Sequence, residues 1–172
     1  PTPLPATDYL LIESTYGNRF HESMFDEKKK LKDVVNKVAK RGGKIIIPAF
    51  FFFWTQEIVY HLNVLWQHQD IPDLPIYVDS PLSVNISDVF TSHPECFDDE
   101  VYSEFINNRK NPFGFGRLQY IHSVDESKAL NNLNGPAIII SSSGMCENGR
   151  ILHHLKNNIE DSRNMVLIVG YM

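Results

Sequence analysis

A short run of β-branched residues, followed at once by a serine- and glycine-rich stretch, constrains this chain most. The run is Pro136–Ile140, and it is too short to form a helix of its own. A continuous apolar run of this length is typical of a strand that is buried on both faces, as in parallel sheets. Residues 141–150 then lead into a helix that begins near Ile151. The stretch therefore predicts a buried strand, a polar turn and a helix in direct succession.

The same alternation of short apolar runs and helical periodicity recurs along the whole chain. Strands are predicted at residues 8–13, 44–50, 75–79, 118–122, 136–140 and 165–169. Helices are predicted near residues 22–41, 55–66, 80–90, 98–106, 125–132 and 151–161, with Thr55 and Ser80 as caps. Strands that alternate with helices imply right-handed crossovers and a parallel sheet. The expected fold class is therefore α/β, a Rossmann-like, mostly parallel sheet with helices on both faces.

The composition indicates a globular chain without a broadly basic surface. Its 172 residues are 42% hydrophobic and 22% charged, with a formal net charge of −5. A polyanion would therefore have to bind at a local patch. The two cysteines, Cys96 and Cys146, are too few for a disulfide framework, which favours a cytoplasmic location. No apolar run reaches the roughly 18 residues of a membrane span, and a start without Met suggests a piece of a longer protein.

Polar or glycine-rich segments follow the ends of several predicted strands. They are residues 14–17, 79–82, 141–145 and 170–171. The carboxyl ends of parallel strands meet at one edge of a sheet, where ligands bind in open α/β folds. The sequence therefore predicts a binding site along this edge.

Residues 141–150 have the composition of a phosphate-binding turn. Serine hydroxyls, backbone N–H groups and the positive end of the following helix can together hold a phosphate. The residues assigned to this contact are Ser141, Ser142, Ser143, Gly144 and Met145. Arg150, in the first helical turn, can add a charge-assisted hydrogen bond. The alternative is an ordinary loop whose serines only cap and turn the chain.

The histidines and cysteines do not form a recognisable catalytic or metal-binding pattern. None of the seven histidines lies at the spacing of a zinc motif, and His153 and His154 point about 100° apart on a helix. No metal site is therefore predicted within this chain. No histidine stands in a recognisable relation to Cys146, and the glycine-rich motifs of dinucleotide and nucleoside triphosphate sites are absent.

Two carboxylates at strand ends each allow two interpretations. Glu13 ends an apolar strand, where a carboxylate is costly unless paired, so it either faces a crevice as a hydrogen-bond acceptor or turns to water. Asp79 has the same alternatives, with a structural role at the helix start favoured. Arg19 and His21 are interpreted as surface groups in preference to anion contacts.

Eight segments spread along the chain form a pattern when they are taken in order. They are residues 12–21, 41–43, 47–50, 55–57, 79–82, 111–113, 127–131 and 141–156. Together they resemble the β-CASP group of metallo-β-lactamase-fold nucleases, with the bacterial and archaeal branch as the nearest match. This group includes the endonuclease subunit of the eukaryotic cleavage and polyadenylation factor. The resemblance covers nearly the whole chain.

The resemblance implies a cap domain that covers a metallo-β-lactamase domain, with RNA entering the cleft between them. It assigns residues 1–17 to the last strand region of the metallo-β-lactamase domain and residues 18–172 to the β-CASP domain. In that family two zinc ions activate the hydroxide that attacks the phosphodiester, and their ligands precede and follow the stretch seen here. Glu13 matches the acidic motif that orients a downstream catalytic histidine, and residues 141–145 match the cleft wall that holds RNA phosphates. By itself the chain is therefore expected to be inactive and to bind RNA weakly.

Residues 51–54 depart from the pattern of the family. After Pro48-Ala49-Phe50 the family usually has a small residue, an apolar residue and then Gly-Arg, whereas this chain has Phe51-Phe52-Phe53-Trp54. These aromatic residues either hold RNA by stacking on Trp54 or pack against another domain or partner. Packing is the favoured interpretation.

The expected partners are RNA and the metallo-β-lactamase domain of the same polypeptide. No membrane partner is expected, and a homodimer is compatible with the sequence. Two other functions stay open, a non-catalytic RNA-binding or scaffold subunit and a stand-alone Rossmann-like module for a nucleotide or small anion. A His-x-His-x-Asp-His motif in the whole protein would separate the nuclease from the scaffold.

Overall fold

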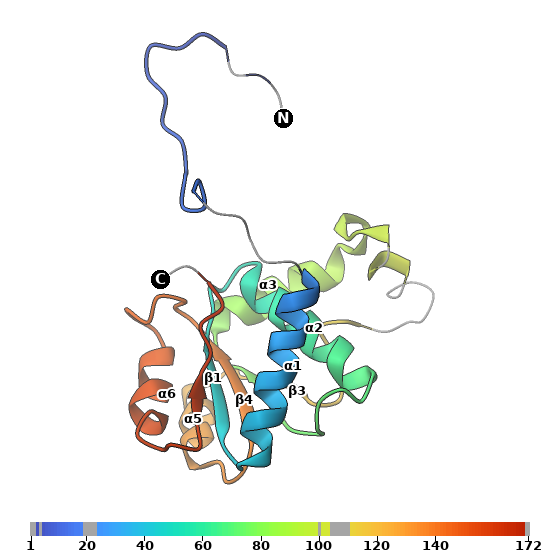
Figure 1. Ribbon diagram of the computed structural model, residues 1–172, viewed down its shortest axis with the longest axis vertical. Coiled ribbons are helices and arrows are strands. Elements are labelled where there is room, and N and C mark those ends of the chain that lie inside the picture. Colours follow the sequence, from blue (N-terminus) through green and yellow to red (C-terminus); the bar gives the residue numbers. More distant parts are fainter. Residues whose placement is uncertain (1–2, 4, 19–23, 100, 104–110, 171–172) are drawn as a thin grey trace.

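A five-stranded parallel sheet lies at the centre of the computed structural model, which describes residues 3, 5–18, 24–99, 101–103 and 111–170 (Figure 1). The strands are β1 Lys44–Pro48, β2 Ile76–Val78, β3 Leu118–Tyr120, β4 Ala137–Ser141 and β5 Met165–Val166. Their spatial order is β3-β2-β4-β1-β5, and every neighbouring pair is parallel. The predicted α/β fold with a parallel sheet is confirmed.

Helices connect the strands close to the predicted places. They are α1 Met24–Lys40, α2 Trp54–Gln67, α3 Pro81–Ser92, α5 Val124–Ala129 and α6 Ile151–Asn158, with short 3₁₀ turns η1 Pro94–Cys96 and η2 Leu130–Asn132. Residues 99 and 101–103 are also helical, and the end of that predicted helix lies outside the described residues. None of the helices in the described ranges is long and apolar enough to cross a membrane.

Two hydrophobic cores cover the two faces of the sheet. In β4, Ile138 and Ile140 belong to one core and Ile139 to the other, and all three side chains are fully buried. The first core is completed by residues of α1 and α2, and the second by Leu130 of η2 and Ile151 of α6. Each buried isoleucine contributes about 2 kcal/mol of hydrophobic stabilisation. Burial on both faces thus explains why β4 is apolar from Ala137 to Ile140. The loop after β4 starts from this buried strand.

The starts of α2 and α3 differ in how they are capped. Ser80 accepts a hydrogen bond from the Ser83 N–H at 3.3 Å, with Pro81 in the first turn, as predicted. The expected cap at Thr55 is wrong, because α2 begins at Trp54, and Phe53, two residues before Thr55, occupies the cap position without a side-chain hydrogen bond. Thr55 is buried, and its hydroxyl donates instead to the Phe50 carbonyl at 2.9 Å.

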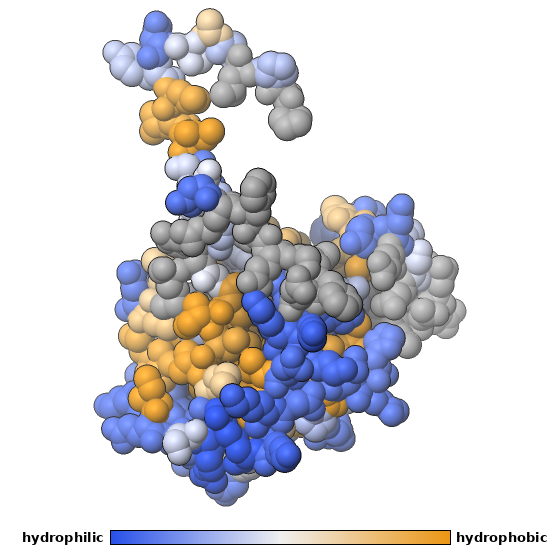
Figure 2. Space-filling model, in the orientation of Figure 1, coloured by the Kyte–Doolittle hydropathy of each residue, from blue (hydrophilic) through white to orange (hydrophobic). Residues whose placement is uncertain are grey.

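Residues 5–12 form an arm without regular structure that stands away from the sheet (Figure 1). The predicted strand at residues 8–13 has no strand partner within the described residues, and Tyr9 and Leu11 are 90% and 94% exposed. Figure 2 shows hydrophobic surface in this arm and around the C-terminal end of the chain, where Ile168 is half exposed. A strand at 8–13 therefore needs a partner outside this sheet, and the assignment of residues 1–17 to another domain stays a prediction.

Candidate functional site

The carboxyl ends of β2 and β4 are joined by hydrogen bonds between their polar continuations. β2 and β4 are adjacent and parallel, so Asp79 and Ser80 lie beside Ser141 and Ser142. The Ser141 hydroxyl donates to the Asp79 carbonyl at 2.7 Å, and the Ser142 hydroxyl donates to the Ser80 hydroxyl at 2.7 Å. Two of the predicted edge segments, 79–82 and 141–145, are therefore in direct contact.

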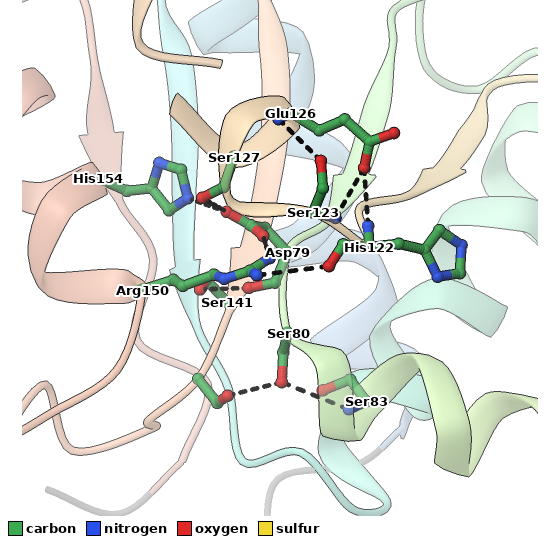
Figure 3. A network of polar contacts seen from close by, with 11 residues as sticks. Asp79, Ser80, Ser83, His122, Ser123, Glu126, Ser127, Ser141, Arg150 and His154 are labelled. Carbon is green, nitrogen blue, oxygen red and sulfur yellow. Dashed lines mark hydrogen bonds and ion pairs between the residues drawn. The ribbon is translucent and has the colours of Figure 1, made fainter. Parts of the chain in front are cut away.

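The carboxylate of Asp79 is fully buried at this junction and is surrounded by donors (Figure 3). Arg150 Nη1 donates to Oδ1 at 2.6 Å, and His154 Nε2 lies 2.6 Å from Oδ2. The Ser127 hydroxyl also donates to Oδ2, at 2.5 Å. A buried charge is tolerated only when it is paired in this way. The predicted structural role of Asp79 is thus extended, because it joins α5 and α6 to the end of β2.

Burial and hydrogen bonding act on the pKa of Asp79 in opposite directions. Burial favours the neutral acid and raises the pKa, whereas the hydrogen bonds from His154, Ser127 and Arg150 lower it. The lowering prevails, so the pKa of Asp79 lies below its ordinary value. Asp79 is therefore a carboxylate at neutral pH, and it holds the Arg150 guanidinium in place.

Arg150 is engaged by this buried network. Besides the bond to Asp79, its Nη2 donates to the His122 carbonyl at 3.5 Å, and the side chain is only 20% exposed. In Figure 3 both Arg150, which immediately precedes α6, and His154 of α6 reach toward Asp79. The geometry supports a structural role for Arg150, and its contact with a phosphate stays a prediction.

The loop between β4 and α6 uses several of its own N–H groups. Ser143 N–H donates to the Asn148 carbonyl, and Cys146 N–H donates to the Ser143 carbonyl. Glu147 N–H donates to the Ser143 hydroxyl at 3.3 Å, and Ile151 N–H, at the start of α6, donates to the Ser142 carbonyl at 3.3 Å. These N–H groups are used within the loop. Fewer of them are therefore available to an anion than in a turn that opens directly into a helix.

Gly149 is required where this loop returns to α6. Its φ is +83°, and a Cβ placed on it would lie 2.4 Å from the Ser142 carbonyl oxygen. Gly149→Ala is therefore expected to lower the free energy of unfolding by about 2–3 kcal/mol, as the sum of a left-handed backbone and a steric clash.

Gly135 provides a matched control for this substitution. Its φ is +87°, but a Cβ there would meet nothing within 4 Å. Gly135→Ala should cost only about 1 kcal/mol in urea unfolding. Equal losses for the two variants would contradict the close approach of Gly149 to Ser142.

A cavity of about 500 Å³ opens at the carboxyl edge of the sheet and brings distant segments together. Its walls come from the turn after the arm, the end of β1 with the start of α2, the loop after β4, and the last described residues. The lining residues are Glu13, Thr15, Tyr16, Pro48, Ala49, Phe50, Trp54, Ser143, Gly144, Met145, Glu147, Asn148, Val169 and Gly170. The expectation that the turn after Ile12 and the loop after Ile140 lie on the same side of the fold is met.

Glu13 enters this cavity as an ionised group. Its Oε1 accepts a hydrogen bond from the Thr15 N–H at 2.6 Å, and hydrogen bonding from Thr15 lowers the pKa of the carboxyl. The side chain is exposed, so the carboxylate is available to a further donor. Its catalytic role, like the phosphate contact of Ser141 to Met145, stays a prediction, and Arg19 and His21 lie outside the described residues.

A second cavity, of about 840 Å³, lies at the amino ends of β2 and β3. Trp66 and Phe115 line it, with ring centroids 5.6 Å apart, together with Asp73 and Arg117. Three of its polar side chains are paired with one another, since Trp66 Nε1 donates to Asp73 and Arg117 forms an ion pair with Asp73. This cavity is larger than the one beside Glu13, but its charged groups are already paired with each other, whereas the Glu13 carboxylate is exposed.

The described residues do not fit a zinc ion. No group of three or more His, Cys, Asp or Glu side chains among them is placed to hold a metal. Asp79 and His154 come together, but their neighbours are Ser127 and Arg150, and a guanidinium repels a cation. No step of the function is therefore assigned to a metal held by these residues.

His154 is the residue of the network that the sequence reasoning missed. The sequence shows His154 only as a histidine without a metal-binding pattern, yet it is 1% exposed and contacts a carboxylate 75 positions away. The available signal was the four-residue spacing of Arg150 and His154, which places both on one face of α6.

Comparison with known proteins finds relatives that are named as ribonucleases or as a subunit of a cleavage and polyadenylation factor. It is 37% identical over 172 residues to "Ribonuclease TTHA0252" of Thermus thermophilus, covering 99% of this chain and 39% of that protein. It is 32% identical to "Endoribonuclease YSH1" of Candida glabrata and 30% identical to "Cleavage and polyadenylation specificity factor subunit 3-I" of Arabidopsis thaliana, covering 98–99% of this chain and 22% and 24% of those proteins.

The chain thus spans about two-fifths of the bacterial relative and about a quarter of the eukaryotic ones. Residues 55–172 match the Beta-Casp domain family, whereas the predicted domain boundary at residue 18 stays a prediction. Because this match extends over more than half of the sequence, the chain belongs to the Beta-Casp domain family.

Proposed function

We propose that this chain is the RNA-binding part of a ribonuclease and forms one wall of the cleft in which RNA is cleaved. The cavity that joins Glu13 to Ser143, Gly144 and Met145 carries this proposal, because it brings the acidic turn and the polar loop to one edge of the sheet. The printed names of the relatives support RNA as the substrate. The rest of the polypeptide supplies the other wall.

In this proposal the residues of the chain position the reacting groups. Glu13 is an exposed, ionised acceptor, and it orients a histidine from the remainder of the protein by accepting its N–H. The loop after β4 lines the path of the RNA strand, and the buried network around Asp79 keeps that loop in register. Two zinc ions belong to the remainder of the polypeptide, since the described residues do not fit them.

Removal of metal tests the proposed division of labour. In the full-length protein, chelation is expected to abolish cleavage of a labelled single-stranded RNA, and added Zn²⁺ is expected to restore it. The 172-residue chain by itself is expected to leave the same RNA intact with or without Zn²⁺. Cleavage by the isolated chain would contradict the proposal, and so would a full-length protein that neither binds nor cleaves RNA. Binding without cleavage by the full-length protein would favour the scaffold alternative.

A further inference from the structure

The aromatic residues between β1 and α2 do not all point in one direction. Phe50 and Trp54 line the cavity that contains Glu13, and Phe50 is 50% exposed. The ring centroid of Phe52 lies 6.1 Å from that of Phe90 of α3, and Phe53 lines a different cavity together with Phe90. Phe50 and Trp54 therefore line the candidate RNA site, and Trp54 also lines a neighbouring cavity together with Leu31 and Leu167.

The backbone of this loop changes direction at Phe53, whose ring contacts that of Trp54 edge to face. Phe53 adopts a φ of 67°, in the left-handed region that a bulky residue rarely occupies. The chain turns sharply there, and the next residue, Trp54, starts α2. The Thr55 hydroxyl donates to the Phe50 carbonyl and so links the two ends of the loop. This hydrogen bond keeps Phe50 and Trp54 at the same cavity.

The charge of the cavity does not suit a phosphate group. Among the residues that the structure describes, the lining includes Glu13 and Glu147 but no lysine, arginine or histidine. Arg150, the predicted cation, is held by Asp79. A phosphate placed in this cavity would meet two carboxylates, and no described lining residue supplies a compensating cation, which is an unfavourable arrangement.

A nucleobase suits the same cavity better. Bases are neutral and flat, and they stack on aromatic side chains whatever their sequence. Phe50 and Trp54 provide aromatic surface, while Ser143 and Asn148 place hydroxyl and amide groups where the polar edge of a base can be hydrogen-bonded. The volume, about 500 Å³, lies in the range of small-molecule sites.

We infer that Phe50 and Trp54 form a stacking site for an unpaired base of the RNA substrate, beside Glu13. This inference rests on the proposed function. It names the substrate class of the cleft as single-stranded RNA, which is bound here through a base. The phosphates on either side of the stacked base lie outside the cavity, away from Glu13 and Glu147. Packing of the same rings against another part of the polypeptide is the competing outcome.

The test measures RNA binding by the full-length protein, with a chelator present to keep the RNA intact. Fluorescence anisotropy is read with a labelled unstructured oligonucleotide and with an abasic oligonucleotide of the same length. Trp54→Ala is expected to raise the Kd for the base-bearing RNA about tenfold. The abasic RNA should bind the wild type and Trp54→Ala equally weakly, because it has nothing to stack.

Phe52→Ala is the matched control, since Phe52 is as exposed as Phe50 but does not line the cavity. Its Kd should stay within about twofold of wild type.

The outcomes separate this inference from the proposed function. If wild type binds RNA but Trp54→Ala binds both oligonucleotides as wild type does, the stacking site is wrong and the proposed function stands. Loss of secondary structure in Trp54→Ala is addressed by Trp54→Phe, which should retain preference for the base-bearing RNA. Loss of that preference in a folded Trp54→Phe, with full binding by Phe52→Ala, would mean that the ring packs against protein and would also overturn the inference.

Discussion

Replacement of Asp79 by alanine is expected to lower the free energy of unfolding by about 3–5 kcal/mol. The substitution leaves Arg150 and His154 without the carboxylate that both contact at 2.6 Å, and His154 is fully buried there. It also removes the acceptor of the Ser127 hydroxyl. Urea unfolding of the chain, followed by circular dichroism, measures the change.

Asp33 provides the control for this substitution, since it is an exposed aspartate on α1. Asp33→Ala should change the free energy of unfolding by no more than about 0.5 kcal/mol. A loss for Asp79→Ala that is no larger than that for Asp33→Ala would show that the buried network does not hold the fold together.

The contribution of Asp79 should also depend on pH in a definite direction. Because the pKa of Asp79 is lower in the folded state than in the unfolded chain, the unfolded state binds its proton first as the pH falls. The stabilisation is therefore complete above the unfolded pKa of about 3.9 and is lost as the pH falls through the folded pKa. The difference in stability between wild type and Asp79→Ala should accordingly be constant near neutral pH and should shrink only below about pH 4.

Replacement of Glu13 by glutamine is expected to slow RNA cleavage by the full-length protein by about 10²-fold or more, with little change in the Kd for RNA. The variant keeps the shape of the side chain but removes the negative charge that would hold the partner histidine. If Glu13 acts by positioning that histidine, the pH dependence of kcat should shift together with the loss of rate.

An exposed glutamate outside the cavity serves as the control for this experiment. Glu160, beyond the end of α6, is exposed and does not line the candidate site. Glu160→Gln should cleave RNA at the wild-type rate. A Glu13→Gln protein with the same rate as Glu160→Gln would remove Glu13 from the catalytic machinery.

The sheet could be predicted from the sequence because its central strands are specified by local composition. The isoleucine runs at 45–47 and 138–140 are buried on both faces, so no other element could accommodate them. The strand expected at residues 8–13 is apolar too, but a strand also needs a partner, and none lies beside it among the described residues. Local pattern predicts a preference for extended structure without predicting the pairing.

The buried network was beyond the reach of sequence reasoning for a related reason. Asp79 contacts His154, 75 positions away, because β2 and β4 are neighbours in the sheet. The periodicity of apolar residues does not predict the order of the strands. The sequence therefore predicts a phosphate contact for Arg150 from its charge and does not show its ion pair with Asp79. The edge of the sheet that carries the site could be predicted, because carboxyl ends of parallel strands always share an edge.

Photo-crosslinking of the full-length protein to a single-stranded RNA with a photoreactive uridine tests the placement of the RNA most directly. If RNA runs along the carboxyl edge of the sheet, the crosslinked peptides should contain Tyr16, Phe50, Trp54 or Met145, which all line the cavity beside Glu13. Crosslinks confined to Trp66 and Phe115, in the cavity at the amino ends of β2 and β3, would contradict it.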